Sequence, residues 1–261
     1  MRPLLGTSGR SVVITGAGHG VGREIALTLA QNRSIIFGTA NSSQEAEDLR
    51  RASSGRVSLI VCDMEKTEMV NAWAAGVAEA IGDSGLDLLI NTAVPLRPGP
   101  LEVLPLGGVR RGFEVNVFGG LAVINAFLPS LRLAQGRIIQ ISRWRRDRPL
   151  PFDGPSDASQ AAMEAFSAAY RAELEPFGID VVIASLEDLE PSTDDVAEGL
   201  GQIDKSMTAL QRKLYGKQLR LRMGQRPVGR ESDRLVTAAK RVVDLAMQSQ
   251  VPVRAAIDSG A

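Results

Sequence analysis

The chain has 261 residues, enough to bury a core without support from disulfides or metals. Its 30 Lys and Arg balance 30 Asp and Glu, so no global charge attracts nucleic acid or an anionic membrane. The single cysteine, Cys62, excludes an internal disulfide and is predicted to be a small core residue. Residues 1–10 lack a secretory signal, and no apolar run reaches the roughly 18 residues of a membrane span. We therefore expect a cytoplasmic protein with no nucleic-acid partner and no membrane partner.

Short apolar runs alternate with segments of helical period as far as residue 185. The apolar runs predict strands at 11–15, 34–39, 57–61, 86–91, 137–142 and 179–185. The intervening segments predict helices at 21–32, 43–53, 65–81, 109–134 and 156–176. Strands that are apolar throughout indicate a sheet covered on both faces, and strand–helix alternation indicates parallel crossovers. The predicted fold class is α/β, a doubly wound parallel sheet (Rossmann fold) in a single domain.

A glycine-rich loop joins the first strand to the first helix and reads TGAGHGVG from Thr15 to Gly22. In such a loop Gly16 permits the turn, Gly20 lets the backbone approach a pyrophosphate, and Gly22 lets helix and strand pack closely. Amides at the helix N-terminus then donate to the phosphates. A tight turn that binds nothing is the alternative. The predicted cofactor-binding residues of this loop are Thr15, Gly16, Gly18, His19, Gly20, Val21 and Gly22.

The last third of the chain is polar, with no strand signal before its end. A loop is expected at 191–195, a basic helical stretch at 201–223, and an amphipathic helix at 233–247. We divide the single domain, residues 1–261, into a nucleotide-binding core at 11–185, a helical substrate-side segment at 186–250, and a last strand at 251–257.

Further landmarks follow the loop in order. Asp63 and Met64 follow the third strand, Asn91 and Ala93 follow the fourth, and Asn116 lies in the long helix. Together with the TGxxxGxG spacing, these motifs resemble the short-chain dehydrogenase/reductase family over nearly the whole chain. The ending at 252–261 is similar to the family's hydroxysteroid and retinol-type branch. The resemblance implies that Asp63 contacts adenine and that Asn116 holds a water in a proton relay.

The family's catalytic positions are filled differently in this chain. The resemblance places Arg143 at the family's serine, Ser156 at its tyrosine and Gln160 at its lysine. In the family, the lysine lowers the tyrosine pKa from about 10 toward working pH, so that a proton arrives with the hydride. A serine hydroxyl beside a neutral glutamine cannot be tuned that far. The family's proline-glycine after the sixth strand is also replaced, by Leu186 and Glu187.

Three hypotheses for the function stay open. The chain is a pseudoenzyme or partner subunit, or it is an enzyme with non-redox chemistry that uses Arg143, Ser156 or Asp157. The third is an oxidoreductase that acts on a carbonyl or hydroxyl substrate by a non-standard proton route.

The cofactor prediction rests on charges near the ribose. Residues 39–41 follow the second strand without the acid that NAD-preferring proteins use to bind the ribose hydroxyls. His19 lies in the glycine-rich loop, where NADP-preferring relatives carry a basic residue. NADP(H) is therefore favoured over NAD(H), with no cofactor as the alternative. His19 is the only histidine, and no metal site is predicted.

Two partner surfaces are predicted. Arginines cluster from Arg143 to Arg148, where they would bind a small-molecule or anionic ligand, or else form a solvated loop paired with nearby aspartates. The helices at 109–134 and 156–176 carry small and apolar residues. In the short-chain dehydrogenase/reductase family, which this chain resembles, these helices form the dimer face. We therefore expect a homodimer or tetramer, or pairing with a paralogue.

Overall fold

A computed structural model describes residues 9–144, 149–186, 189, 192–224 and 230–258. Seven strands form one parallel sheet in the order β3-β2-β1-β4-β5-β6-β7, which confirms the predicted doubly wound fold. The strands are β1 Ser11–Ile14, β2 Ile35–Ala40, β3 Val57–Val61, β4 Leu88–Asn91, β5 Arg137–Ser142, β6 Asp180–Ser185 and β7 Arg254–Ala256. The strand order reverses between β1 and β4, so this switch point is where a ligand site is expected.

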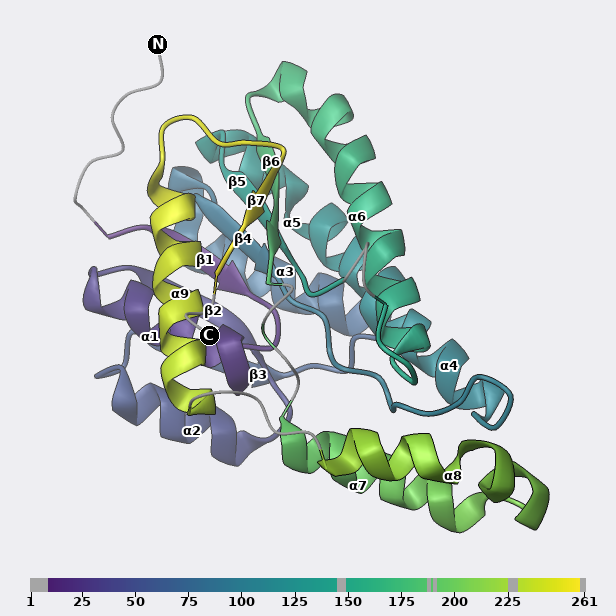
Figure 1. Cartoon of the computed structure of the whole chain (residues 1–261). Coiled ribbons are helices and arrows are strands. Elements are labelled where there is room, and N and C mark those ends of the chain that lie inside the picture. The colour runs from purple at the N-terminus through teal and green to yellow at the C-terminus, as the bar shows by residue number, and fades with distance from the viewer. Residues whose placement is uncertain (1–8, 145–148, 187–188, 190–191, 225–229, 259–261) are drawn as a thin grey trace.

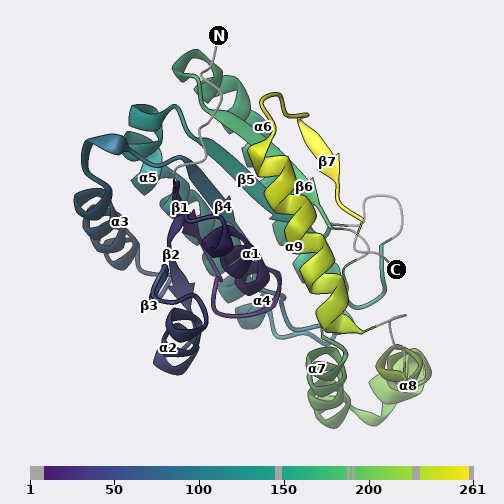
Figure 2. The ribbon, with the colours of Figure 1, turned by 90° about the vertical axis from the view of Figure 1, so that its left-hand side faces the viewer.

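Helices cover both faces of the sheet because successive strand side chains point to opposite sides. Val12 and Ile14 pack with α1 Gly20–Gln31, α2 Ser43–Ala52 and α9 Glu231–Met247. Val13, between them, packs on the other side with α3 Thr67–Ile81, α5 Gly120–Ala134 and α6 Gly154–Leu174. Figures 1 and 2 show the two helical layers with the sheet between them. Short 3-10 turns, Gly82–Ser84 and Glu175–Phe177, follow α3 and α6.

The edge strand β3 corrects two predictions. The apolar run was expected to be covered on both faces, but Ile60 is 38% exposed and Val61 is 48% exposed. An edge strand has a neighbour on one side only, which leaves the end of this strand partly open to solvent. Cys62, predicted as a core residue, is only half-buried. Burial, with the nearby Asp63 carboxylate, raises the pKa of its thiol.

The long helix predicted at 109–134 consists of three consecutive segments of one continuous helix. α4 Leu106–Phe113 leads into a π-helical turn, Glu114–Gly119, which continues as α5. Leu106–Ala134 is long and apolar enough to cross a membrane by length and composition. In this structure α5 packs against α3 and β4, as the core helix of a sheet protein does.

The helical segment after β6 differs from its prediction in two places. The expected loop at 191–195 gives way to α7 Thr193–Ser206, and the stretch at 201–223 is divided between α7 and α8 Ala209–Gly224. Thr208 and Gln211 explain the break: the Thr208 hydroxyl accepts from the Gln211 amide at 3.2 Å, and Gln211 Oε1 accepts from the Thr208 amide at 2.9 Å. This reciprocal cap starts a new helix.

Arg137 joins β5 to the end of α9. Its side chain is buried, and Nη1 donates to the carbonyls of Ala246 at 2.7 Å and Gln248 at 2.8 Å. Nη2 donates to Asp180 Oδ2 at 2.9 Å, at the start of β6. The guanidinium therefore satisfies carbonyls that the helix leaves unpaired and neutralises a carboxylate.

Replacing Arg137 with alanine is expected to lower the free energy of unfolding by about 3 kcal/mol, because it removes the donor to the carbonyls at the end of α9 and breaks the ion pair with Asp180. Urea unfolding followed by circular dichroism measures the change. Arg56→Ala, at an exposed arginine, is the control and should change the free energy by less than about 0.5 kcal/mol. Equal effects in the two variants would contradict the assignment.

Candidate functional site

The carboxyl ends of β1, β4 and β5 are joined by buried side chains. The Thr15 hydroxyl donates to Asn91 Oδ1 at 3.0 Å, and Asn91 Nδ2 donates to Gln140 Oε1 at 2.9 Å. Thr92 adds a second link, because its hydroxyl donates to the Thr15 carbonyl at 2.7 Å. Thr15 and Asn91, both predicted to contact the cofactor, thus hold the sheet edge together beneath the site.

A cavity of about 570 Å³ opens at this edge. It extends from the glycine-rich loop to the start of α6 and to α7, and its volume is typical of small-molecule sites. The predicted residues that line it are Gly16, His19, Gly20, Val21, Gly22, Ala93, Arg143, Ser156 and Gln160. The cavity therefore brings the predicted cofactor loop and the family's catalytic positions into one space.

The glycine-rich loop fits a pyrophosphate. Gly16 has φ +63°, and a Cβ there would approach Thr92 Oγ1 to 2.6 Å. Gly20 has φ +54°, which disfavours other residues, and a Cβ at Gly22 would collide with the Gly16 carbonyl. No side chain caps α1, and its first turn carries no acid. The amides at this N-terminus are thus available to an anion.

Other predicted cofactor residues lie outside the cavity wall. Gly18 lies against Glu45 and Ala40, and Met64 lies against Gly119. Asp63 Oδ1 accepts from the Glu65 amide at 3.1 Å, and its Oδ2 lies 3.6 Å from Lys66 Nζ. The adenine contact of Asp63 stays a prediction from the resemblance.

Sequence reasoning missed Glu45. Its Oε2 accepts from the Asn41 amide at 2.9 Å, directly after β2, and packs against Gly18. Asn41 in turn bonds His19 Nδ1 through its side-chain amide at 3.3 Å. The signal was the serine three residues earlier: Ser42 caps α2, and a glutamate at this spacing commonly reaches back over the helix start.

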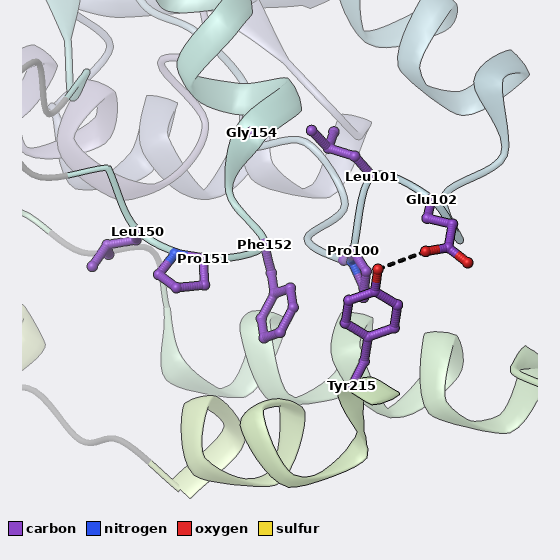
Figure 3. A pocket seen from close by; sticks show the side chains of 9 residues that line it. Pro100, Leu101, Glu102, Leu150, Pro151, Phe152, Gly154 and Tyr215 are labelled. Atoms are coloured by element: carbon purple, nitrogen blue, oxygen red, sulfur yellow. Dashed lines mark hydrogen bonds between the residues drawn. The ribbon is translucent and has the colours of Figure 1, made fainter. Parts of the chain in front are cut away.

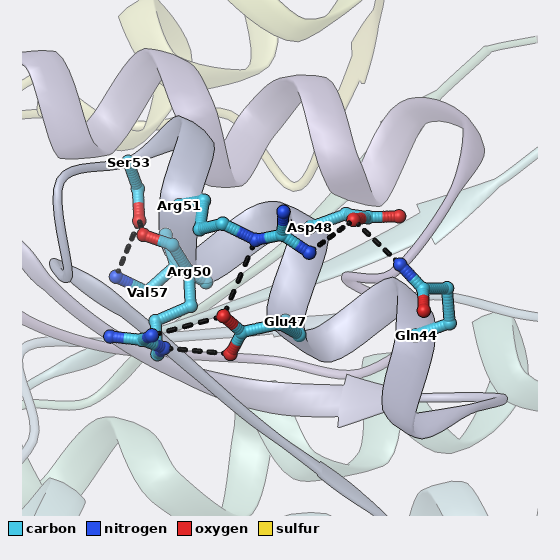
Figure 4. A network of polar contacts seen from close by, with 7 residues as sticks. All are labelled: Gln44, Glu47, Asp48, Arg50, Arg51, Ser53 and Val57. Carbon is cyan, nitrogen blue, oxygen red and sulfur yellow. Dashed lines mark hydrogen bonds and ion pairs between the residues drawn. The ribbon is translucent and has the colours of Figure 1, made fainter.

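The other carboxylates of α2 face away from the loop. Glu47 pairs with Arg50 and Arg51, and Asp48 pairs with Arg51 and accepts from Gln44, on the outer side of the helix (Figure 4). These exposed pairs contribute little to stability. Glu45 is thus set apart within α2, as a carboxylate next to the glycine-rich loop.

The three catalytic positions have structural partners. Ser156 Oγ accepts from the Leu96 amide at 2.9 Å. Gln160 Oε1 accepts from the Arg143 amide, and its Nε2 lies 3.4 Å from the Ser156 carbonyl. The neighbouring Ser142 is buried, and its Oγ accepts from the Trp144 amide at 3.2 Å. Ser142 does not line the cavity, as expected for an offset of one residue along a strand.

Asn116 lies in the π-helical turn and forms hydrogen bonds with the backbone of the segment after β4. Its Oδ1 accepts from the Val94 amide at 2.9 Å, and its Nδ2 donates to the Val94 carbonyl at 2.8 Å. Nδ2 also lies 3.3 Å from Ser159 Oγ. Asn116 therefore fixes one wall of the cavity, and π-helical turns are frequent at such places.

Neither tyrosine reaches the cavity. Tyr170 donates to Asn125 at 2.8 Å, and burial together with Glu173 raises its pKa. Tyr215 donates to Glu102 at 2.6 Å, and that hydrogen bond raises its pKa. A raised pKa makes each phenol a poorer acid near neutral pH.

Some predicted features lie outside the described residues. These are Arg145, Arg146, Asp147 and Arg148 of the arginine cluster, and Glu187 of the proline-glycine replacement. Arg143 is half-buried on the cavity wall, and Leu186 is fully buried. Within the described part of the chain, no cluster of three His, Cys, Asp or Glu side chains could hold a metal ion.

A family model for short chain dehydrogenases matches residues 10–194. The chain belongs to this family of oxidoreductases, whose members bind a nicotinamide cofactor. It is 33% identical over 182 residues to estradiol 17-beta-dehydrogenase 2 of Mus musculus, covering 69% of this chain and 48% of that protein. It is 34% identical over 173 residues to retinol dehydrogenase 16 of Homo sapiens, covering 66% and 54%. The predicted hydroxysteroid and retinol-type branch is thereby confirmed.

The chain spans about half the length of these curated relatives. Among solved structures, a short-chain dehydrogenase from Streptomyces avermitilis superposes with a TM-score of 0.77 at 25% identity, covering 95% of this chain and 88% of that one. A metagenomic short-chain oxidoreductase in complex with NADP gives a TM-score of 0.72 at 21% identity, covering 96% and 97%. NAD+-bound xylitol dehydrogenase gives 0.77 at 21%, covering 97% and 99%. The fold thus occurs with either dinucleotide.

Replacing Asn116 with alanine is expected to speed hydrogen exchange at the Val94 amide at least about fivefold, since a neutral hydrogen bond contributes about 1 kcal/mol. Exchange followed by NMR or mass spectrometry measures this. Asn125→Ala, which removes only the exposed partner of Tyr170, is the matched control. Unchanged exchange at Val94 would mean that Asn116 does not hold this wall.

Proposed function

We propose that this chain binds NADP(H) in the cavity between the glycine-rich loop and α6, and that it lacks the tyrosine-dependent proton transfer of its family. The main support for this proposal is that Ser156 and Gln160 occupy the family's tyrosine and lysine positions. Ser156 is a weak acid whose oxygen already accepts from Leu96, and Gln160 has no charge with which to tune an acid. The lining residues within the described part of the chain include neither tyrosine nor lysine.

The cofactor-binding role rests on the glycine-rich loop. The uncapped N-terminus of α1 would hold the pyrophosphate, and Gly16, Gly20 and Gly22 give the backbone the room to approach it. A bound cofactor would supply or accept a hydride. Asn116 and Ser156 would keep the backbone at Val94 and Leu96 in place beside it.

Charges near the ribose set the choice of cofactor. The lack of an acid at 39–41 and the presence of His19 support NADP(H). Glu45 opposes it, because a carboxylate at the end of β2 repels a 2′-phosphate. We therefore propose NADP(H) binding that is micromolar or weaker, with Glu45 as the group that limits it.

Two roles agree with retained binding and absent proton transfer. In the first, the chain is a pseudoenzyme or partner subunit in the cytoplasm. The exposed Phe118, Leu133 and Phe166, on the helices of the family's dimer face, support self-association or pairing with a paralogue. In the second, Arg143 serves non-redox chemistry, because a guanidinium on the cavity wall can stabilise an oxyanion or bind an anionic ligand.

An oxidoreductase with another proton donor is the second candidate function. Asp153 and Asp157 line the same cavity as Ser156. Asp157 directly follows Ser156 in α6, which makes it the nearer candidate for a replacement acid.

Titration with NADPH, followed by fluorescence or calorimetry, is expected to give saturable binding. Gly20→Asp should weaken binding at least about tenfold by placing a carboxylate against the pyrophosphate.

Glu45→Gln should tighten NADPH binding about fivefold and leave NADH binding unchanged, because only NADPH carries the repelled phosphate. Glu47→Gln, on the outer side of the same helix, should change neither. No saturable binding to either dinucleotide would overturn the proposal, and tighter NADH binding would overturn the cofactor choice.

The wild type is expected to show no NADPH-dependent reduction of aldehydes, ketones or hydroxysteroids. Neither Ser156→Tyr/Gln160→Lys nor a single repair should restore turnover, because residues that act as a unit lose activity non-additively. Adding Arg143→Ser tests whether the cavity still admits the substrate. Wild-type turnover of about 1 per second or faster would contradict the pseudoenzyme role. Loss of that turnover in Asp157→Asn would then establish the second candidate.

A further inference from the structure

The outer face of α8 is apolar and basic. Leu210, Leu214 and Leu221 are 66%, 57% and 62% exposed, and spacings of four and seven residues put them on one side of the helix. The opposite side packs on α7, with Gly216 and Leu219 buried. Single exposed leucines are ordinary on soluble proteins, but a row of three along an unpartnered helix is a patch.

Cations flank this row. Lys213, Lys217 and Arg220 are exposed, and no carboxylate occurs anywhere in α8. Two further arginines of α8 are committed elsewhere, since Arg212 pairs with Asp204 and Arg222 with Asp153. No ion-pair partner occurs for Lys213, Lys217 or Arg220 within the described residues, and all three are exposed beside the row of leucines.

The row lies at one end of the molecule, where Figures 1 and 2 show α7 and α8 projecting beyond the sheet. Beside α8 is a second, more open cavity of about 500 Å³, with Tyr215 of α8 and the 69% exposed Leu101 on its wall (Figure 3). Its walls, 99–102 and 150–154, continue the segments that line the main cavity. The patch and this cavity therefore share α8 at the same end of the molecule.

We propose that the outer face of α8 docks on an anionic lipid surface, with the three leucines in the interface and the three cations against the headgroups. Basic amphipathic helices that bind membranes combine these two features. A second copy of this chain is disfavoured, because α8 against α8 would bring the cations together with no carboxylate between them. This peripheral docking differs from the expectation of no membrane partner, and it does not depend on cofactor binding or catalysis.

Vesicle flotation tests the docking with phosphatidylcholine alone and with added phosphatidylserine. The wild type should float with the anionic vesicles and be released by salt. Lys213→Glu/Lys217→Glu should weaken binding about tenfold or more. The control Arg56→Glu/Lys240→Glu, with the same charge change at exposed sites on other elements, should retain it.

A second pair of variants tests the leucines. Leu214→Ser/Leu221→Ser should also lose binding, whereas Ile35→Ser/Val253→Ser, at residues 57% and 52% exposed elsewhere, should not. Unchanged thermal melting would show that all four variants fold.

Absence of wild-type binding, or binding retained by both α8 variants, would overturn the proposal. Binding that is lost in the lysine variant but kept in the leucine variant would indicate a surface for anions in general, such as an acidic protein. A lower mass of the leucine variant than of the wild type in light scattering would indicate that a second copy covers this face. Either result overturns the lipid assignment.

Discussion

A chain of buried hydrogen bonds crosses the sheet from Thr15 on β1 through Asn91 on β4 to Gln140 on β5. Each of these polar groups is shielded from water, so each must find its partner within the protein. Three segments leave the sheet where this chain of bonds ends: the glycine-rich loop, the segment after β4, and the segment after β5. The geometry of the candidate site depends on keeping these three strand ends in register.

The two ends of the cavity differ in what their residues do. At the glycine-rich loop, the backbone is arranged for a ligand that the protein does not itself supply, because α1 is left without a cap. At the start of α6, Ser156 and Gln160 are bonded to the backbone of Leu96 and Arg143. These two side chains thus fix the backbone of the cavity wall. A fold does not by itself determine the chemistry of the site placed on it.

Local pattern predicted most of the fold. The strands β1 to β6 and their helices follow from apolar period and glycine position, and the glycine-rich loop is where TGAGHGVG indicates. The misses have different causes. The exposure of Val61 is tertiary, because it depends on which strand lies at the edge of the sheet. The division between α7 and α8 is local, because the cap formed by Thr208 and Gln211 starts a new helix.

The candidate site was predictable only in part. Gly16, Gly20 and Gly22 were predicted from the loop sequence, because their constraints, a positive φ or a close backbone contact, arise within the loop and its neighbouring segments. Glu45 acts on the loop from another helix, and Asn91 turns out to serve the sheet, so neither role can be read from neighbouring residues.

We propose that one cavity joins a dinucleotide site to catalytic positions of the family that hold no proton donor of the family's kind. A crystal structure of the wild type grown with NADPH tests this most directly. The account predicts the pyrophosphate at the amides of Val21 and Gly22, and the nicotinamide beside Ser156 and Gln160 with no tyrosine in contact. A dinucleotide bound elsewhere, or a tyrosine brought against the nicotinamide, would contradict it.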